Sequence, residues 1–291
     1  MSTLKNAALE APGDHLYHSA TVRGDSLIIG DGFEARSFKD AKFAGLMDPL
    51  VMVDHFVMSQ PTFGEHPHAG ISAVSVLLED SVGIFNSQDS LGNYDDLQPG
   101  DLYWLKAGKG ATHDEKPVEG GIAHGLQIFV NLPGRFKNDE PQVFHVSSRD
   151  IPVIQTEDFR IRIVLGESND VVGQQSPSLP LTILDAYLKP QGTYTHSIQG
   201  DQAVWTYAVC GRANLTIDGK MFELAEGEAL AVHINTEQAE LSLASEVGAH
   251  AVVLQGNPIR EQMIQHGPFA MSNSADKDAV AVVQGKDNWD L

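Results

Sequence analysis

The sequence predicts an all-β protein made of two similar β-barrels, and three observations lead to that fold class. Short apolar or alternating runs, rich in β-branched and aromatic residues, recur along the chain and are bounded by glycine, proline or aspartate. Few windows repeat apolar residues at helical spacing over three turns. Segments of the first half also resemble segments of the second half. Short strands at intervals of roughly ten residues favour a barrel or sandwich over alternating strands and helices.

The individual strands follow from those runs. The predicted strands are, in chain order, 72–80, 126–133, 160–167, 181–188, 203–211 and 213–219. A short C-terminal helical segment is predicted in "ADKDAVAVVQG" (275–285), and "PIREQMIQHG" (258–267) is a second helix candidate.

The repeat between the two halves predicts the domain organisation. "LQPGDLYWLKAG" (97–108) and "LAEGEALAVHIN" (224–235) share an apolar residue, a turn closed by glycine and an acid, and then a strand. Each follows a strand–turn–strand segment. We therefore expect two domains, residues 1–146 and 147–291, with the second barrel holding no metal because its half lacks any closely spaced histidine pair.

Charge and cysteine content exclude several classes of protein. Lysine and arginine number 19 against 39 acids, a formal charge of −20, so we expect no direct nucleic-acid or membrane contact, both of which need clustered positive charge. Cys210 is the only cysteine, which rules out an intrachain disulfide and a CxxC zinc site. The sequence shows neither a signal-peptide core nor a membrane-length apolar run. A cytoplasmic protein is the expectation, or a nuclear one in a eukaryote.

The stretch "GEHPHAGI" (64–71) holds the first pair of candidate metal ligands, His66 and His68. In a strand, residues two apart point to the same face at a separation of roughly 6.6–6.8 Å. Two imidazoles so placed can converge on one ion with bonds of about 2.0–2.1 Å. Pro67 points the other way and suits a strand start. The alternative for such a pair is two solvated loop histidines.

The segment "AGKGATHDEKP" (107–117) supplies a second pair, His113 and Glu115, again on one face if the segment is extended. Taken alone, this pair also fits a surface turn. Together the two pairs offer three imidazoles and one carboxylate, which predicts a mononuclear metal site with two open positions for a six-coordinate ion. Such a donor set suits Fe(II), with Zn, Mn, Ni or Co as substitutes.

Several longer motifs resemble those of the pirin family, a group of bicupins within the cupin superfamily. They are "LMDPLVMVDHF", "GEHPHAG", "DSLGN", "LQPGDLYWLKAGKGATHDE", "GLQIFVNLP" and "GNPIREQMIQHGPFAMSN". The resemblance runs from about residue 20 to residue 285. It implies two jelly-roll-like cupin barrels, with iron held in the N-terminal one by His66, His68, His113 and Glu115.

The resemblance also implies an activity, because some pirins are quercetinase-like dioxygenases. The implied substrate is a small aromatic, flavonol-type molecule in the N-terminal barrel. Glu115 is also the candidate acceptor of the substrate proton, a role open to a carboxylate that detaches from the metal. Three positions depart from the family pattern: Ala69 stands in place of arginine, Ser72 in place of glutamate, and Ser87 where many members have histidine. Two alternatives use the same ligands: an iron-dependent redox-sensing protein or transcriptional co-regulator with a protein partner, and a barrel stabilised by a structural metal.

Overall fold

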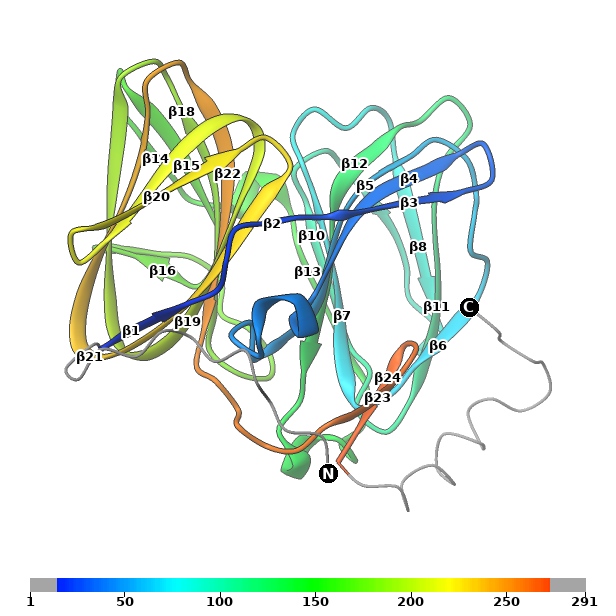
Figure 1. The fold of residues 1–291 in the computed structure, drawn as a ribbon. Helices are drawn as coiled ribbons and strands as arrows, with labels where there is room; N and C mark the ends of the chain where they lie inside the picture. The colour runs from blue at the N-terminus through cyan, green and yellow to red at the C-terminus, as the bar shows by residue number, and fades with distance from the viewer. Residues whose placement is uncertain (1–14, 273–291) are drawn as a thin grey trace. The chain divides into compact units, whose positions relative to one another are not determined.

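The computed structural model describes residues 15–272, and its regular secondary structure is almost all β-strand (Figure 1). Within that range three short 3-10 helices accompany the strands: η1 (Asp40–Phe43), η2 (Gly134–Phe136) and η3 (Ser148–Asp150). The predicted all-β class is therefore confirmed. None of the helices in residues 15–272 has the length and apolar character of a membrane span. The helix predicted over 275–285 lies outside the described residues.

The described chain divides into two compact units. One, here called the N-terminal barrel, comprises residues 25–37, 50–148 and 259–272; the other, the C-terminal barrel, comprises residues 15–24, 38–49 and 149–258. One change of unit falls between residues 148 and 149, two residues from the predicted domain boundary. Residues 15–24, at one end of the described chain, belong to the C-terminal barrel, and residues 259–272, at the other end, belong to the N-terminal barrel. The two units are therefore not contiguous in sequence. Strand β1 (Leu16–His18) shows this directly, because it pairs with β21 (Glu228–Ser245).

The N-terminal barrel contains two antiparallel sheets and a hairpin. The larger sheet has the order β13-β10-β7-β12-β5-β4-β3 and the smaller one β6-β11-β8-β9. The bounds in the larger sheet are β3 (Asp25–Ile29), β4 (Phe33–Lys39), β5 (Leu50–Met58), β7 (Ile71–Leu77), β10 (Leu102–Lys106), β12 (Ala123–Asn131) and β13 (Gln142–Val146). The remaining strands are β6 (His66–His68), β8 (Phe85–Asp89), β9 (Tyr94–Leu97) and β11 (Ala111–Pro117), with the hairpin β23 (Ile264–His266) and β24 (Phe269–Met271).

The C-terminal barrel is built on one large sheet of order β1-β21-β19-β22-β18-β15-β14, to which β2 and β20 are added, and on the small hairpin β16-β17. The bounds not yet given are β2 (Val22–Arg23), β14 (Val153–Gln155), β15 (Phe159–Leu165), β16 (Glu167–Ser168), β17 (Val171–Val172), β18 (Leu181–Leu188), β19 (Gly192–Ile217), β20 (Lys220–Ala225) and β22 (Ala249–Gly256). Alternate residues of β18, including Leu184, Ala186 and Leu188, enter one apolar core, as expected for strands with one face inward.

Two expectations from the sequence need correction. The runs 203–211 and 213–219 belong to one long strand, β19, because its pairing with β22 continues through Gly211 and its pairing with β20 begins at Arg212. The candidate helix 258–267 is not formed. Arg260 adopts φ 55°, which a right-handed helix does not allow, and the segment ends in β23 with Gly267 in the turn to β24.

A hydrogen bond between His145 on β13 and Asp101 at the start of β10 gives the N-terminal barrel a testable pH dependence. Nε2 of His145 donates to Oδ2 of Asp101 at 2.9 Å, and this bond raises the pKa of His145. Burial opposes ionisation of Asp101, but hydrogen bonds from His145, Gln98 and Ser148 outweigh it and lower the pKa of that carboxyl.

Replacing His145 with glutamine should therefore cost stability in a defined pH window. Because its folded pKa is raised, the contribution of His145 is fully present below its ordinary pKa of about 6.5 and fades as the pH rises through the raised value. The expected loss is on the order of 1 kcal/mol at pH 6 and close to zero at pH 9. Denaturant midpoints of both proteins at the two pH values measure it, and a loss that grows with pH would contradict the assignment.

Candidate metal centre

Two short antiparallel strands bring the predicted histidines together. Strand β6 pairs with β11 so that His66 lies opposite His113 and His68 lies opposite Ala111. His68 and His113 are buried and His66 is half-buried. Within the described residues, these three histidines offer ring nitrogens that all lie within 4.8 Å of one another.

The separations between the ring nitrogens match those around a single ion. Nε2 of His113 lies 3.0 Å from Nε2 of His68 and 3.1 Å from Nε2 of His66. Two nitrogens bonded to one ion at about 2.0–2.1 Å would be roughly 2.9 Å apart at a right angle and roughly 3.3 Å apart at a tetrahedral angle. The cluster therefore fits a divalent metal without rearrangement of these pairs.

The protonation state of the three histidines also favours a metal site. Burial lowers the pKa of His66, His68 and His113, that of His68 to about 3 with a further contribution from His66, so the rings are neutral near pH 7. Nδ1 of His66 lies 2.9 Å from the carbonyl of Gly64 and donates to it, which leaves a lone pair on Nε2. At most one proton can be shared among the three convergent Nε2 atoms, so hydrogen bonding cannot satisfy all of their lone pairs. A metal ion, by contrast, accepts a lone pair from each nitrogen.

Glu115 lies beside the histidine cluster but is not one of its members. It follows His113 on the same face of β11 and is buried, and its Oε2 lies 3.7 Å from Nδ1 of His113, the nitrogen away from the cluster. The Ser75 hydroxyl contacts both carboxylate oxygens, at 2.8 and 2.9 Å. Burial, partly opposed by that hydrogen bond, raises the pKa of Glu115 to about 7. Ligation by Glu115 stays a prediction.

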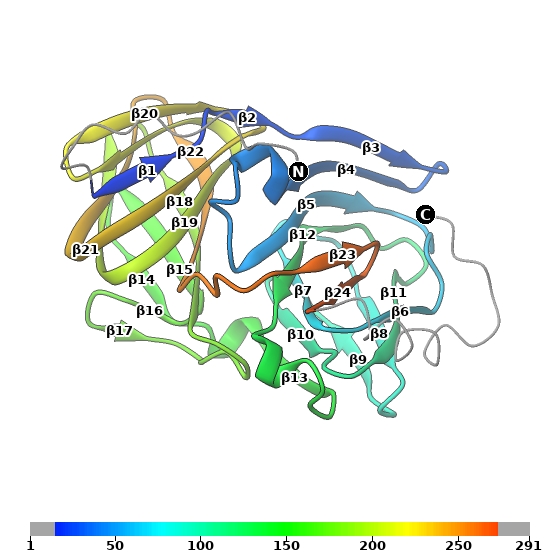
Figure 2. The same cartoon turned by 60° about the horizontal axis from the view of Figure 1, so that its bottom comes forward.

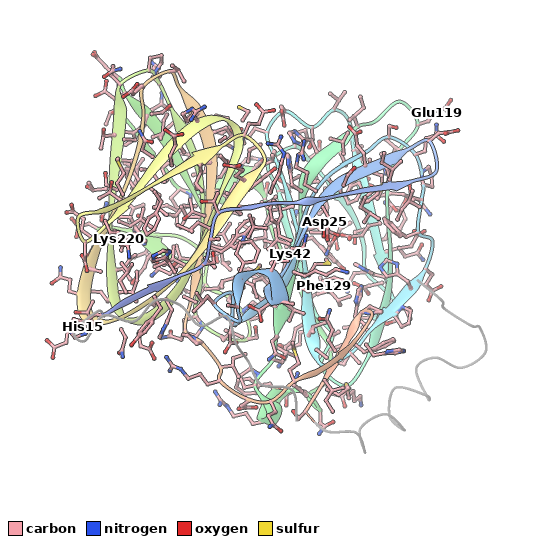
Figure 3. The ribbon with its side chains drawn as sticks, viewed as in Figure 1. His15, Asp25, Lys42, Glu119, Phe129 and Lys220 are labelled. Carbon is pink, nitrogen blue, oxygen red and sulfur yellow. The ribbon has the colours of Figure 1, made fainter. Side chains whose placement is uncertain are left out.

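Phe129 on β12 adds an aromatic ring to the site (Figure 3). Its ring meets that of His68 edge to face, with centroids 5.2 Å apart. The structure thus puts this aromatic ring against a candidate ligand. Ser75 was missed, although a serine in the middle of the apolar run "SAVSVLLED" was a signal that this strand needs a polar group facing inward.

The three departures from the pirin pattern, Ala69, Ser72 and Ser87, are all buried. Ala69 packs with Phe269 and Met271 of the C-terminal hairpin. Ser87 lies opposite Glu115 in the β8–β11 pairing, whereas Ser72 is three residues before Ser75 on β7, so its side chain points to the other face of that strand. Small side chains thus stand at positions where the family carries long ones.

Two other histidines form a separate pair. Nε2 of His55 and Nε2 of His124 are 2.6 Å apart, and Nδ1 of His124 lies 2.7 Å from Asp80. Both histidines are half-buried. They contribute no nitrogen to the three-histidine cluster.

The hairpin β23-β24 lies beside β6 in both ribbon views (Figures 1 and 2). Ala270 donates its backbone N–H to the carbonyl of Ala69 at 3.0 Å. Gly70 follows at φ 72°, and a Cβ there would lie 2.0 Å from the Ala270 oxygen. Only glycine allows the ligand strand to approach the hairpin this closely.

Lys137 holds the same junction with a buried amine. Its Nζ donates to the carbonyls of Gly70 at 2.9 Å and Ala270 at 2.6 Å and to Oδ1 of Asn131 at 2.6 Å. The lysine is 4% exposed. One ammonium group therefore joins the chain next to the candidate ligand His68 to the C-terminal hairpin.

Replacing Lys137 with methionine should destabilise the N-terminal barrel by about 2–4 kcal/mol, because three buried acceptors lose their donor. Denaturant unfolding measures the loss, and hydrogen exchange at the Ala270 amide should accelerate with it. Lys109→Met is the matched control: Lys109 pairs with Glu140 on the surface, so a change within about 0.5 kcal/mol is expected. Equal losses in the two variants would contradict the role given to Lys137.

Comparison with protein families gives a consistent result for both barrels. Residues 18–130 match the family model described as Pirin, and residues 183–281 match the model of the pirin C-terminal cupin domain. Human Pirin is 31% identical to this chain over 229 residues, which cover 78% of each protein. A Pseudomonas aeruginosa protein, named provisionally as a quercetin 2,3-dioxygenase, is 32% identical over 240 residues, covering 78% of this chain and 81% of that protein.

Solved structures share the fold. The crystal structure of a quercetin 2,3-dioxygenase from Acinetobacter baumannii superposes with a TM-score of 0.78 at 23% identity, covering 91% of this chain and 96% of that one. A bacterial pirin from Escherichia coli in complex with nickel(II) gives a TM-score of 0.61 at 20% identity, covering 84% and 99%. These two likenesses show the bicupin fold.

Proposed function

This chain belongs to the pirin family of bicupins, and from that premise we propose that it is a mononuclear iron protein that acts as a dioxygenase on a small aromatic, flavonol-type substrate. The observation that carries the proposal is the convergence of three neutral imidazoles, His66, His68 and His113, through Nε2 atoms at 3.0–3.1 Å from His113. Three imidazoles leave coordination positions for a substrate oxygen and for O2.

The residues around the cluster have complementary roles in this proposal. His66, His68 and His113 hold the metal, which when bound supplies the redox chemistry that dioxygen activation requires. Glu115 accepts the proton of a substrate hydroxyl, and the Ser75 hydroxyl fixes its orientation. Phe129 offers an aromatic edge on which a flat ring system can pack.

The substrate class rests on the relatives. The Pseudomonas aeruginosa relative at 32% identity is named for quercetin oxidation, which motivates a flavonol. Of the three departures from the family pattern, Ser87 lies opposite Glu115 and puts a short side chain beside the site. We therefore expect weak turnover of quercetin itself, because a misplacement of about 1 Å can cost roughly 100-fold in rate.

A different class of function uses the same ligands. Here the iron-loaded protein is a redox-sensing binding protein or transcriptional co-regulator, and its formal charge of −20 suits a basic protein partner. A metal that only stabilises the barrel is a third candidate. The three functions differ in what they require of the metal. A dioxygenase needs a metal that carries out redox chemistry with a substrate, and a redox-sensing protein needs one whose oxidation state alters partner binding. A structural metal needs neither property.

Oxygen consumption separates these functions. Protein stripped of metal is reloaded with Fe(II) or with Zn(II) and given a panel of flavonols and catechols. The dioxygenase proposal expects substrate-dependent O2 uptake by the iron form alone, since zinc has no accessible redox change. No uptake with any substrate, together with different affinities of the ferrous and ferric forms for a basic partner, would replace the enzyme with the redox-sensing protein.

A further inference from the structure

A cavity of about 540 Å³ opens in the C-terminal barrel, which holds none of the three clustered histidines. Its walls come from the β16-β17 segment and from β18, β19 and β22. The volume is in the range of roughly 300–1,000 Å³ typical of small-molecule sites. Its side chains are mostly polar, and those used below are Glu167, Asp170, Gln175, His196, Gln199 and Gln255.

The floor of this cavity is a fixed chain of hydrogen bonds around His196, which is 3% exposed. Nε2 of His196 lies 2.7 Å from Oε1 of Gln255, and its Nδ1 lies 2.7 Å from the hydroxyl of Ser168. The amide oxygen can only accept, so Nε2 carries the proton and Nδ1 accepts from Ser168. The Tyr194 hydroxyl, 2.5 Å from Ser168, then donates to that serine.

Two glutamines of the cavity wall offer hydrogen-bond acceptors, alongside the NH2 group of Gln255, whose oxygen is taken by His196. Gln175 uses its NH2 group on the carbonyls of Gly166 and Gly173, and Gln199 uses its NH2 group on the Ser197 hydroxyl. Both side chains therefore keep their carbonyl oxygens for a ligand.

The charge of the cavity has one sign. Glu167 and Asp170 line it, and the residues that line it include no lysine or arginine. Burial lowers the pKa of His196, while the Glu167 carboxylate raises it by a smaller amount. The imidazole is thus neutral near pH 7 and does not offset the two carboxylates.

From these groups we propose that the cavity of the C-terminal barrel is a binding site for a small organic cation that carries protonated amines. An ammonium group has three donors and no acceptor, which complements amide oxygens and carboxylates. An anion such as phosphate would meet two negative charges and no positive one. The lining also lacks a Phe, Tyr or Trp ring, on which a flat aromatic ligand would stack.

Calorimetric titration of the full-length protein with the triamine spermidine at about 0.15 M salt tests the proposal, because that salt screens exposed charges beyond about 8 Å. The expected result is saturable binding of one spermidine per chain. Sorbitol, an uncharged polyol, and inorganic phosphate should give no binding. Glu167→Gln should weaken spermidine binding about tenfold or more, since it removes one charge-assisted contact.

Glu237→Gln is the matched control, because Glu237 is an exposed acid on β21 of the same barrel and is not part of the cavity wall. Glu237→Gln should leave spermidine affinity unchanged. A loss of affinity seen with Glu167→Gln alone would then come from a contact inside the cavity. Equal weakening by the two substitutions would show general attraction to an acidic surface and overturn the site. Sorbitol binding as tight as spermidine binding would show that the cavity does not select a cation. Absence of saturable spermidine binding would overturn both the site and its selectivity for a cation.

Discussion

Replacement of His113 by alanine is expected to abolish tight metal binding, with an affinity at least about 100-fold below that of the unchanged protein. His113 is the member of the cluster whose Nε2 lies within 3.1 Å of both other Nε2 atoms. Loss of groups that merely support a metal ligand costs about 10–100-fold, and removal of a ligand should cost more. Elemental analysis after dialysis measures the effect, against about one metal per chain in the unchanged protein.

His15→Ala provides the control for this experiment. His15 is an exposed histidine of the C-terminal barrel whose backbone carbonyl accepts from Asn235, so its imidazole can be removed without loss of that bond. Metal content should stay at about one per chain. If the His113 variant keeps its metal while folded, the three-histidine site is wrong. Two tightly bound metals per unchanged chain would instead overturn the expectation that the second barrel holds none.

The site histidines could be predicted because strand geometry is local. Same-face placement of His66 and His68 needs only an extended backbone, and the structure provides it in β6. The alternation of buried and half-buried residues in β11 does the same for His113 and Glu115. That the two segments share one metal site was inferred from the chemistry of the four side chains and from the resemblance to pirins. The direct pairing of β6 with β11 is not a local property and was not predicted.

The missed features depend on contacts between segments that are distant in sequence. Lys137 donates to Ala270, 133 residues away, and nothing in the sequence around a lone lysine signals such a burial. The pairing of β1 with β21 and of Ala69 with Phe269 likewise joins the ends of the chain to distant strands. The segment 258–267 has apolar residues at helical spacing, but it does not form a helix. Arg260 adopts a left-handed conformation that no sequence pattern indicated.

Position alone also limited what could be said of Glu115. Spacing along the strand correctly put the side chain of Glu115 on the same face as that of His113. It could not show whether the carboxylate reaches the metal, because one face of a strand extends beyond the ligands of a single ion. In the structure the carboxylate turns toward Ser75 and lies on the Nδ1 side of His113. That arrangement suits a proton acceptor next to the metal, because its oxygens are held by a hydroxyl and not by the clustered Nε2 atoms.

Glu115→Gln should therefore reduce dioxygenase turnover far more than metal binding. An amide keeps the size of the side chain and an oxygen for Ser75, but it is a much poorer proton acceptor. A positioned general base contributes roughly 10²–10⁴-fold in rate, so turnover of the best flavonol substrate should fall by about that factor. Metal affinity should fall by no more than about tenfold, as for a supporting group.

Asp114→Asn is the matched control, since it makes the same carboxylate-to-amide change one residue earlier on β11. Its side chain points to the opposite face and pairs with Lys116. Its charge makes only a minor contribution to the raised pKa of Glu115, so metal content should be preserved and turnover should change far less than in the Glu115 variant. Rates are compared at full iron occupancy, which separates the chemical step from metal loss. If the Glu115 variant loses metal as severely as the His113 variant, the carboxylate is a ligand of the ion. If it keeps both metal and turnover, the proton is accepted elsewhere, and the assignment of Glu115 fails.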